Sequence, residues 1–269
     1  MTVAAAPHIP GDRAIAQASG RPRERGVALI VVLWGIAALS LIALAMLSAT
    51  LSRANIGRNA WYEAEARTAA DAGVQGAILS LFDPDPRDRQ QLDGSEHSLA
   101  VLSDTVTVSI RDEAGLIDLN AAAPDLLRDY LQTGGLDTGE AAQLAGRIAA
   151  WRAPEGAPAH PFQSVDDVLL IQGMTADLLR KLRPGLTVYG HHANFDTRYA
   201  PREVLAIIPG MAGASADAAI AARQPSAGLT AHAYTIVATA ERHGARFSRR
   251  AVVLLTGDPA RPYWILDWR

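Results

Sequence analysis

The sequence contains no cysteine among its 269 residues. That absence excludes thiol catalysis, thiolate metal sites and a disulfide framework, and it leaves the redox compartment undetermined. Lysine is nearly absent too: of 25 basic residues only Lys181 is a lysine, and the formal net charge is -3. A chain with this charge has no overall positive field to attract nucleic acid or an anionic membrane surface. Bulk electrostatics therefore identifies no partner.

Charge is missing altogether from one long segment near the N-terminus. Val27 to Leu51 contains no charged residue and no histidine, and its apolar side chains leave no polar stripe for a soluble amphipathic helix. A helix of about 25 such residues can cross a bilayer, because it satisfies its own backbone hydrogen bonds. The alternative is a buried core helix. Arg21, Arg23 and Arg25 precede the segment, so the positive-inside rule predicts a cytoplasmic N-terminus and an exported remainder.

A cleaved secretory signal would have a shorter apolar region that ends in a small-x-small site. The tract R-E-R-G-V-A-L-I, residues 23–30, instead resembles a prepilin-type leader, in which a basic stretch ends in glycine and the apolar helix is retained. This resemblance implies that Gly26 precedes the scissile bond and that Val27 becomes the mature N-terminus, methylated by the prepilin peptidase. The alternative is an uncleaved signal anchor.

Most pilins and pseudopilins carry glutamate as the fifth residue after the cut, but here that residue is Val31. A carboxylate within the bilayer costs on the order of 3 kcal/mol at the helix centre unless it is paired. In pilin-like filaments the terminal amine of the preceding subunit is expected to neutralise it. A subunit with valine needs no such neighbour, so Val31 marks a subunit suited to the tip of the filament.

Residues 52–82 continue as an alanine-rich helix, with apolar residues at three- and four-residue steps, until Asp83-Pro84-Asp85-Pro86 ends it. Small residues on several faces would allow subunits to stack closely, or equally would allow the helix to pack on a sheet. Alternation predicts a strand over Asp104–Asp112. Further strands are predicted at the far end of the chain, over Tyr234–Glu241, Arg246–Leu255 and Tyr263–Trp268, with a turn at His243-Gly244 between the first two.

Residues 116 to about 225 lack this alternation and show helical runs broken by glycine and proline, which predicts an all-helical insertion. The insertion contains a sequence pattern that occurs twice. Asn120 and Asn194 each precede a helix with proline near its first turn, and Gly173 and Gly210 each occupy a turn between two short helices.

Three tracts resemble the minor pseudopilin K family of type II secretion systems: A-R-T-A-A-D-A-G-V-Q-G-A-I-L (66–79), D-E-A-G-L-I-D-L-N-A-A-A-P (112–124) and F-Q-S-V-D-D-V-L (162–169). With the leader and the terminal strands, the resemblance covers nearly the whole chain after Gly26. The predicted fold class is α+β: a long N-terminal transmembrane helix continues into a pilin-like αβ domain with a large inserted all-helical domain. The predicted boundaries are 1–26 for the leader, 27–82 for the helix, 83–115 with 226–269 for the αβ domain, and 116–225 for the insertion.

The resemblance implies a non-enzymatic protein at the tip of the secretion pseudopilus, where it nucleates and caps assembly for export across the outer membrane. The implied location is the bacterial inner membrane, with a single pass, a cytoplasmic N-terminus and the bulk in the periplasm. The implied partners are minor pseudopilins of the I and J types, the major pseudopilin, the prepilin peptidase and the inner-membrane assembly platform. Nucleic acid is not among them.

The glycine turns favour one rival function, because helix-hairpin-helix modules bind the DNA backbone through such turns, and a membrane-anchored receptor for DNA uptake would combine them with one membrane helix. Charge opposes it. From Leu116 to Pro225 there are nine Arg or Lys residues against twelve acidic ones, whereas phosphate binding requires a basic face. Arg180, Lys181 and Arg183 form a basic cluster whose simpler interpretation is a solvated helix end.

Catalytic and metal-binding motifs are weak. His191 and His192 lack H-E-x-x-H spacing, and we interpret them as a solvated pair rather than as zinc ligands. No nucleophile elbow, phosphate loop or dinucleotide fingerprint occurs, so no catalytic residue is nominated. Asp83, Asp85, Asp88 and Asp93 offer oxygen ligands, but Pro84 and Pro86 restrict their convergence. Related pseudopilins can bind calcium, so the resemblance allows this cation without assigning its ligands, and no other cofactor is predicted.

Overall fold

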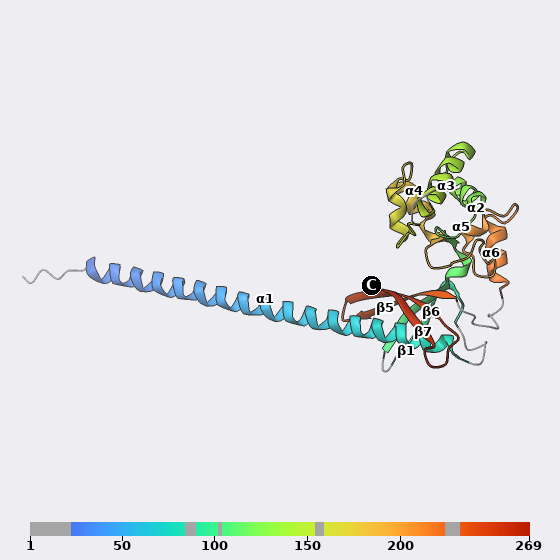
Figure 1. Ribbon diagram of the computed structural model, residues 1–269. Helices are drawn as coiled ribbons and strands as arrows, with labels where there is room; N and C mark the ends of the chain where they lie inside the picture. Colours follow the sequence, from blue (N-terminus) through green and yellow to red (C-terminus); the bar gives the residue numbers. More distant parts are fainter. Residues whose placement is uncertain (1–22, 84–89, 102–103, 154–158, 224–231) are drawn as a thin grey trace, which may run out of the picture. The chain divides into compact units, whose positions relative to one another are not determined.

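The computed structural model describes residues 23–83, 90–101, 104–153, 159–223 and 232–269. Contacts divide the chain into two compact units, Met1–Arg58 and Asn59–Arg269. Within the described ranges, the first unit is helical, whereas the second combines helices with an antiparallel sheet (Figure 1). The predicted α+β class is therefore confirmed.

Helix α1 (Arg23–Leu81) belongs to both units. Its last turn precedes Asp83 and Pro84, as the proline predicts, because proline cannot donate the next backbone hydrogen bond. From Asn59 onward one face of α1 is buried, and its residues recur at three- and four-residue intervals: Ala66, Ala69, Ala70, Val74, Ala77, Ile78 and Leu81. These small residues pack on the sheet of the same chain.

Five antiparallel strands form the main sheet, in the order β1-β2-β5-β6-β7. Their bounds are Asp93–Val101 for β1, Asp104–Asp112 for β2, Ala233–Arg242 for β5, Ala245–Leu255 for β6 and Tyr263–Trp268 for β7. Strand β2 pairs with β5 in a register that places Ile110 opposite Ile236. Both side chains belong to the core that the sheet forms with α1. One face of the sheet is therefore covered by α1.

Strand β2 has the predicted bounds, and β5, β6 and β7 agree with prediction to within two residues. His243 and Gly244 form the predicted turn between β5 and β6, with φ of 48° and 84°. Two positive φ values in a two-residue hairpin loop match the right-handed twist of the flanking strands. Strand β1 was not predicted. Its sequence, DGSEHSLAV, is mostly polar, and it pairs only with β2 at the edge of the sheet.

The chain leaves the sheet after β2 and returns at β5. Between them lie the helices α2 (Pro124–Thr133), α3 (Thr138–Arg152), α4 (Ala176–Leu182), α5 (Arg202–Leu205) and α6 (Ala214–Ala221). Short 3-10 helices also occur in this segment: η1 (Glu113–Gly115), η2 (Val165–Leu170) and η3 (Arg183–Gly185). The all-helical prediction is wrong in one respect, since β3 (Ile117–Asp118) pairs in parallel with β4 (Leu186–Thr187). Two-residue strands show no alternation that a sequence pattern could reveal.

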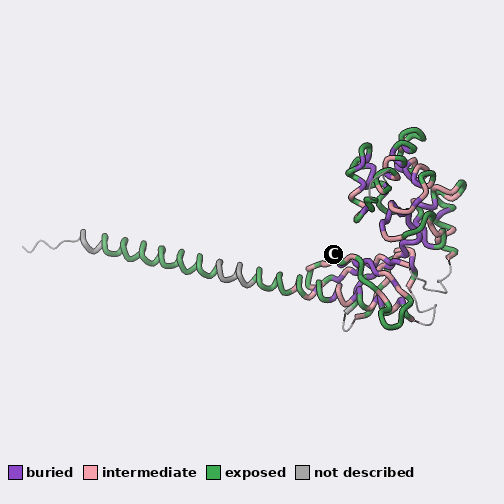
Figure 2. Tube along the Cα trace, viewed as in Figure 1, coloured by how far each residue is buried: buried purple, intermediate pink, exposed green. Residues whose placement is uncertain are grey.

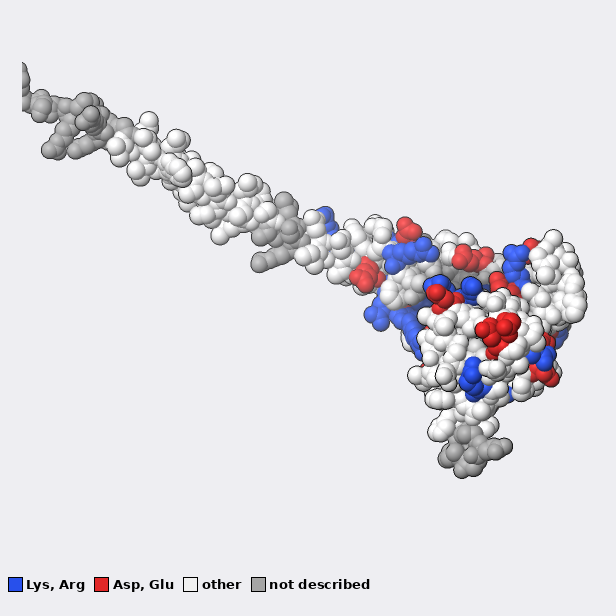
Figure 3. Space-filling model, turned by 90° about the horizontal axis from the view of Figure 1, so that it is seen from above, with Lys and Arg blue, Asp and Glu red and all other residues white. Residues whose placement is uncertain are grey.

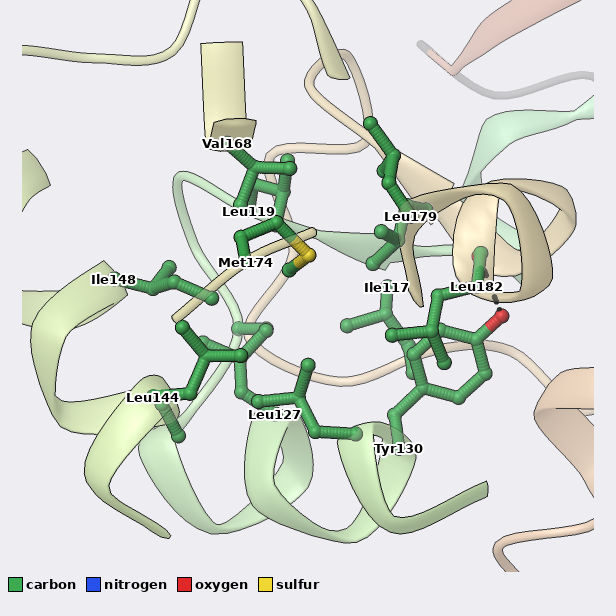
Figure 4. Packing of buried hydrophobic residues seen from close by; sticks show 14 of the residues in the cluster. Ile117, Leu119, Leu127, Tyr130, Leu144, Ile148, Val168, Met174, Leu179 and Leu182 are labelled. Carbon is green, nitrogen blue, oxygen red and sulfur yellow. Dashed lines mark hydrogen bonds between the residues drawn. The ribbon is translucent and has the colours of Figure 1, made fainter. Parts of the chain in front are cut away.

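The inserted segment has its own hydrophobic core, which runs from Ile117 to Ala216 (Figure 4). Tyr130 lies within it at 1% exposure, and its hydroxyl donates a 2.7 Å hydrogen bond to the Leu182 carbonyl. Burial raises the pKa of the Tyr130 hydroxyl, so it remains a donor. Two separate clusters of buried side chains thus stabilise the second unit, one in the insertion and one between α1 and the sheet (Figure 2).

Candidate functional site

The first candidate site is the apolar part of α1. Val27–Ser48 has a mean hydropathy of 2.8 over 22 residues, and none of it is buried in the structure (Figure 2). At 1.5 Å per residue this segment is about 33 Å long, which matches the hydrocarbon core of a bilayer. Trp34 and Leu29 are more than 70% exposed. A soluble core helix would bury these side chains, so the structure favours the membrane anchor over that alternative, by length, composition and exposure.

The residues of the predicted leader junction lie at the start of this helix. Residues 1–22 lie outside the described residues, whereas the backbone from Arg23 through Gly26 is already helical. Val27 and Val31 are 62% and 65% exposed. Both side chains are therefore exposed, and their burial among the described residues does not explain the choice of residue. Cleavage after Gly26 and the role of Val31 remain predictions.

The second candidate site is the pair of glycine turns in the insertion. Gly173 has a φ of 98° and lies between η2 and α4, and Gly210 has a φ of 81° and lies between α5 and α6. Both turns join two short helices, as the repeated sequence pattern predicts. Glycine adopts a positive φ without strain, because it has no Cβ. Asn120 has a structural role, because its side-chain amide exchanges hydrogen bonds of 3.0 and 2.7 Å with the backbone of Phe162.

Three arginines near these turns are paired with carboxylates, whereas Arg147, next to Gly173, has a buried Nε without a partner among the described residues. Arg202 pairs with Asp217 at 3.0 Å, and Arg180 pairs with Asp177 at 2.7 Å. Arg183 pairs with Asp166. On the face seen in Figure 3, basic and acidic side chains are interspersed over the second unit. A DNA backbone would have to displace these internal partners, so the geometry of the turns is present without the basic surface that phosphate binding requires.

A third group of polar residues lies where the chain passes between the sheet and the insertion. Asp112, at the end of β2, accepts a hydrogen bond from the Ala114 amide at 2.9 Å, and its other oxygen lies 3.0 Å from Nδ1 of His232, which precedes β5. Burial raises the pKa of the Asp112 carboxyl, although the contact with His232 opposes the change. The contact between Asp112 and His232 joins the segment that leaves the sheet after β2 to the segment that returns before β5. It therefore holds the two ends of the insertion together.

Glu113 follows Asp112 and is only 2% exposed. Its carboxylate accepts a hydrogen bond from the Thr187 hydroxyl. Burial raises the pKa of Glu113, while the Thr187 and Thr235 hydroxyls and the charges of Arg250 and Arg111 act in the opposite direction. A carboxyl with a perturbed pKa beside a cavity is a candidate for a functional site.

Glu113 lines a cavity of about 460 Å³ between the sheet and the insertion. Arg111 and Arg250 extend into the same cavity from β2 and β6. Sequence reasoning did not single out these three residues. The sequence pattern that could have revealed the cavity is the set of polar residues on the predicted strands. In β2, for example, Ser109 and Arg111 alternate with the buried residues and therefore lie on the opposite face of the sheet.

The remaining candidates of the sequence analysis do not assemble into a site. His191 and His192 are exposed. Of the four aspartates considered for calcium, Asp85 and Asp88 lie outside the described residues, and the Asp93 carboxylate accepts a hydrogen bond from the Ser95 amide at 2.9 Å. No group of three or more His, Asp or Glu side chains that could hold a metal ion occurs within the described part of the chain. Calcium therefore stays a prediction without ligands.

No protein-family model and no curated protein sequence matches the chain. Among solved structures it is similar to one described as "The Crystal Structure of the GspK-GspI-GspJ complex from enterotoxigenic Escherichia coli Type 2 Secretion System". The similarity covers 82% of this chain and 98% of that chain, with 12% sequence identity and a TM-score of 0.47. Similarity this low carries no argument about fold or function, which depend on the chain's own residues.

Proposed function

We propose that this chain is a non-enzymatic minor pseudopilin of the K type, anchored in the bacterial inner membrane with its second unit in the periplasm. One observation carries the proposal. A single helix, α1, supplies an uncharged, unburied span of bilayer length and then, in its second half, the face that packs on an antiparallel sheet. A membrane anchor and a folded head that share one helix suit a subunit held in a filament by its anchor.

The proposal includes removal of residues 1–26 by a prepilin peptidase and methylation of Val27. The basic residues Arg21, Arg23 and Arg25 precede the apolar span, which supports an N-terminus on the cytoplasmic side. Cleavage between Gly26 and Val27 would remove these charges and leave the whole apolar span on the mature chain. The anchor is thereby retained in the membrane after maturation.

We further propose that the chain occupies the tip of the pseudopilus, where it nucleates and caps assembly with I- and J-type minor pseudopilins on the inner-membrane platform, ahead of the major pseudopilin. Two features support this position. Val31 places no carboxylate in the bilayer, so no neighbouring amine is needed to neutralise one. The insertion between β2 and β5 adds a second hydrophobic core, which a tip subunit can carry because no subunit has to stack above it.

The tip position predicts different effects for two substitutions at residue 31. Val31→Glu would introduce an unpaired carboxylate near the end of the span, where the cost is below the roughly 3 kcal/mol of the helix centre, and should reduce recovery of small pilin-like partners with the detergent-solubilised chain several-fold. Val31→Leu keeps the position apolar and is the matched control, with recovery as in the wild type. Equal recovery with both variants would contradict the role assigned to Val31.

The same co-purification separates the proposal from its rival. Recovery of small membrane-anchored partners, with nuclease treatment having no effect, supports the pseudopilin. Salt-sensitive recovery of DNA without such partners would instead support a DNA receptor that uses the turns at Gly173 and Gly210. Salt at about 0.2 M should not release the pilin-like partners, because apolar helix contacts are not screened.

A further inference from the structure

The cavity beside Glu113 lies on the sheet face opposite α1. Arg111 is paired with Thr235 across β2 and β5, and Val237 is paired with both Ser109 and Arg250. These side chains alternate with the buried residues that pack under α1, so they share the other face. Residues of η2, η3 and β4 in the insertion close the cavity from the opposite side.

The five arginines that line the cavity differ in whether each is paired with a carboxylate. Three of its five arginines are engaged, because Arg183 pairs with Asp166, Arg269 with Asp267, and Arg180 with a neighbour on its own helix. Arg111 and Arg250 have no carboxylate within ion-pair distance among the described residues. Arg111 donates to the Pro184 carbonyl at 3.3 Å, and Arg250 donates to the Thr235 hydroxyl at 3.5 Å. Two guanidinium groups on one sheet face therefore retain donors for an oxyanion.

Two side chains that line the cavity each carry a buried polar atom that lacks a partner in the described part of the chain. One is the donor Nε of Arg111, and the other is the acceptor Oδ2 of Asp267. Burying such groups is unfavourable unless a ligand or water satisfies them. A ligand that brought only negative oxygens would leave Asp267 unsatisfied and would be repelled by it. A ligand with both carboxylate oxygens and N–H groups would complement the opposite charges of Arg111 and Asp267, which both line the cavity.

We propose that this cavity binds the carboxyl-terminal end of another polypeptide. The terminal carboxylate lies between Arg111 and Arg250, and a backbone N–H of the peptide donates to Asp267. Leu116, Val165 and Leu186 supply apolar surface for its side chains. A volume of about 460 Å³ lies within the range of sites for ligands of a few residues. A phosphate dianion fits less well, because Glu113, Asp166 and Asp267 line the same cavity.

The test uses the full chain in detergent micelles, immobilised and exposed to a pool of randomised tetrapeptides. Half of the pool carries a free terminal carboxylate and half carries a terminal amide. Mass spectrometry of the eluted peptides should show the carboxylate form enriched about tenfold or more, since charge-assisted hydrogen bonds of this kind are among the stronger ones. Arg250→Gln and Arg111→Gln should each abolish the enrichment. Arg246→Gln, an exposed arginine of β6 outside the cavity, should leave it unchanged.

Arg250→Lys keeps the charge but loses the planar fork, so it should retain part of the enrichment. Near-UV circular dichroism identifies any variant that has lost its native packing. Such a variant is set aside, and the peptide enrichment is judged from the variants that keep the native packing. Equal capture of carboxylate and amide peptides by the wild type would overturn the proposal. So would enrichment that survives both glutamine substitutions. Recovery of pilin-like partners is independent of all these results.

Discussion

At the scale of single residues, Glu113 combines nearly complete burial with a raised pKa. Its folded-state pKa exceeds its unfolded value, so its contribution to stability is present below about pH 4.5 and is lost as the pH rises through the folded pKa. Glu113→Gln removes the cost of ionisation and keeps an acceptor for Thr187. The variant should therefore have a higher Tm than the wild type at pH 7, and the difference should shrink as the pH is lowered toward 4.5.

Thermal unfolding of the full chain in detergent between pH 4 and pH 8 measures this difference. Glu241→Gln, at an exposed position of β5, is the matched control. A Glu113→Gln protein that is less stable than the wild type at pH 7 would show that the carboxylate is instead held in its ionised form by Arg111 and Arg250.

Gly115 lies where the chain enters the insertion, and its neighbour is backbone rather than a movable side chain. A Cβ added there would lie 2.4 Å from the carbonyl carbon of Tyr199 and 2.7 Å from the amide nitrogen of Ala200. Gly115→Ala should destabilise the chain by about 1–3 kcal/mol, as overpacking does, measured by denaturant unfolding. Gly146→Ala, on the exposed side of α3, meets no atom within 4 Å and should stabilise by about 0.5–1 kcal/mol. Equal effects would contradict the close approach.

At the scale of secondary structure, the contact of α1 with the sheet depends on a glycine. A Cβ at Gly73 would lie 2.7 Å from Cγ1 of Val106 and 3.1 Å from Cβ of Ala238, so α1 approaches β2 and β5 closely only because a side chain is missing. Gly73→Leu should therefore lower stability by about 1–3 kcal/mol. Gly57→Leu, at a position of α1 with nothing within 4 Å, is the matched control and should cost little. Calorimetry of both variants distinguishes this packing from an unspecific effect of leucine in the helix.

Elements with a strong period could be predicted from the sequence, and elements held by tertiary contacts could not. Strand β2 alternates cleanly and was predicted residue by residue, and the apolar span of α1 was predicted from its missing charge. Strand β1 was missed because six of its nine residues are charged, histidine, serine or glycine, and its pairing with β2 forms it. The pair of β3 and β4 joins residues about 70 positions apart, which no local pattern reveals.

The candidate sites follow the same division. Gly173 and Gly210 were predicted as turns, because glycine next to apolar residues marks a turn locally. Arg111, Glu113 and Arg250 were not predicted as a group, because they come from β2, η1 and β6 and meet only in the folded chain. The ion pair between the nearly buried Arg249 of β6 and Asp71 of α1 was missed for the same reason.

At the scale of the whole molecule, the proposed function requires both units on one mature chain. Residues 27–48 must stay attached, because they are the part that can enter a membrane with its partners. The folded second unit, Asn59–Arg269, has two hydrophobic cores of its own. Processing should therefore shorten the chain only at its N-terminal end, at the junction of Gly26 and Val27.

The most direct measurement is the intact mass and N-terminal sequence of the chain extracted from membranes of cells that contain a prepilin peptidase. We expect a carbonate-resistant membrane protein that begins at a methylated Val27, and an unprocessed, longer chain for Gly26→Ala. A soluble chain that lacks residues 27–48, or normal maturation of the Gly26→Ala variant, would contradict the proposed function.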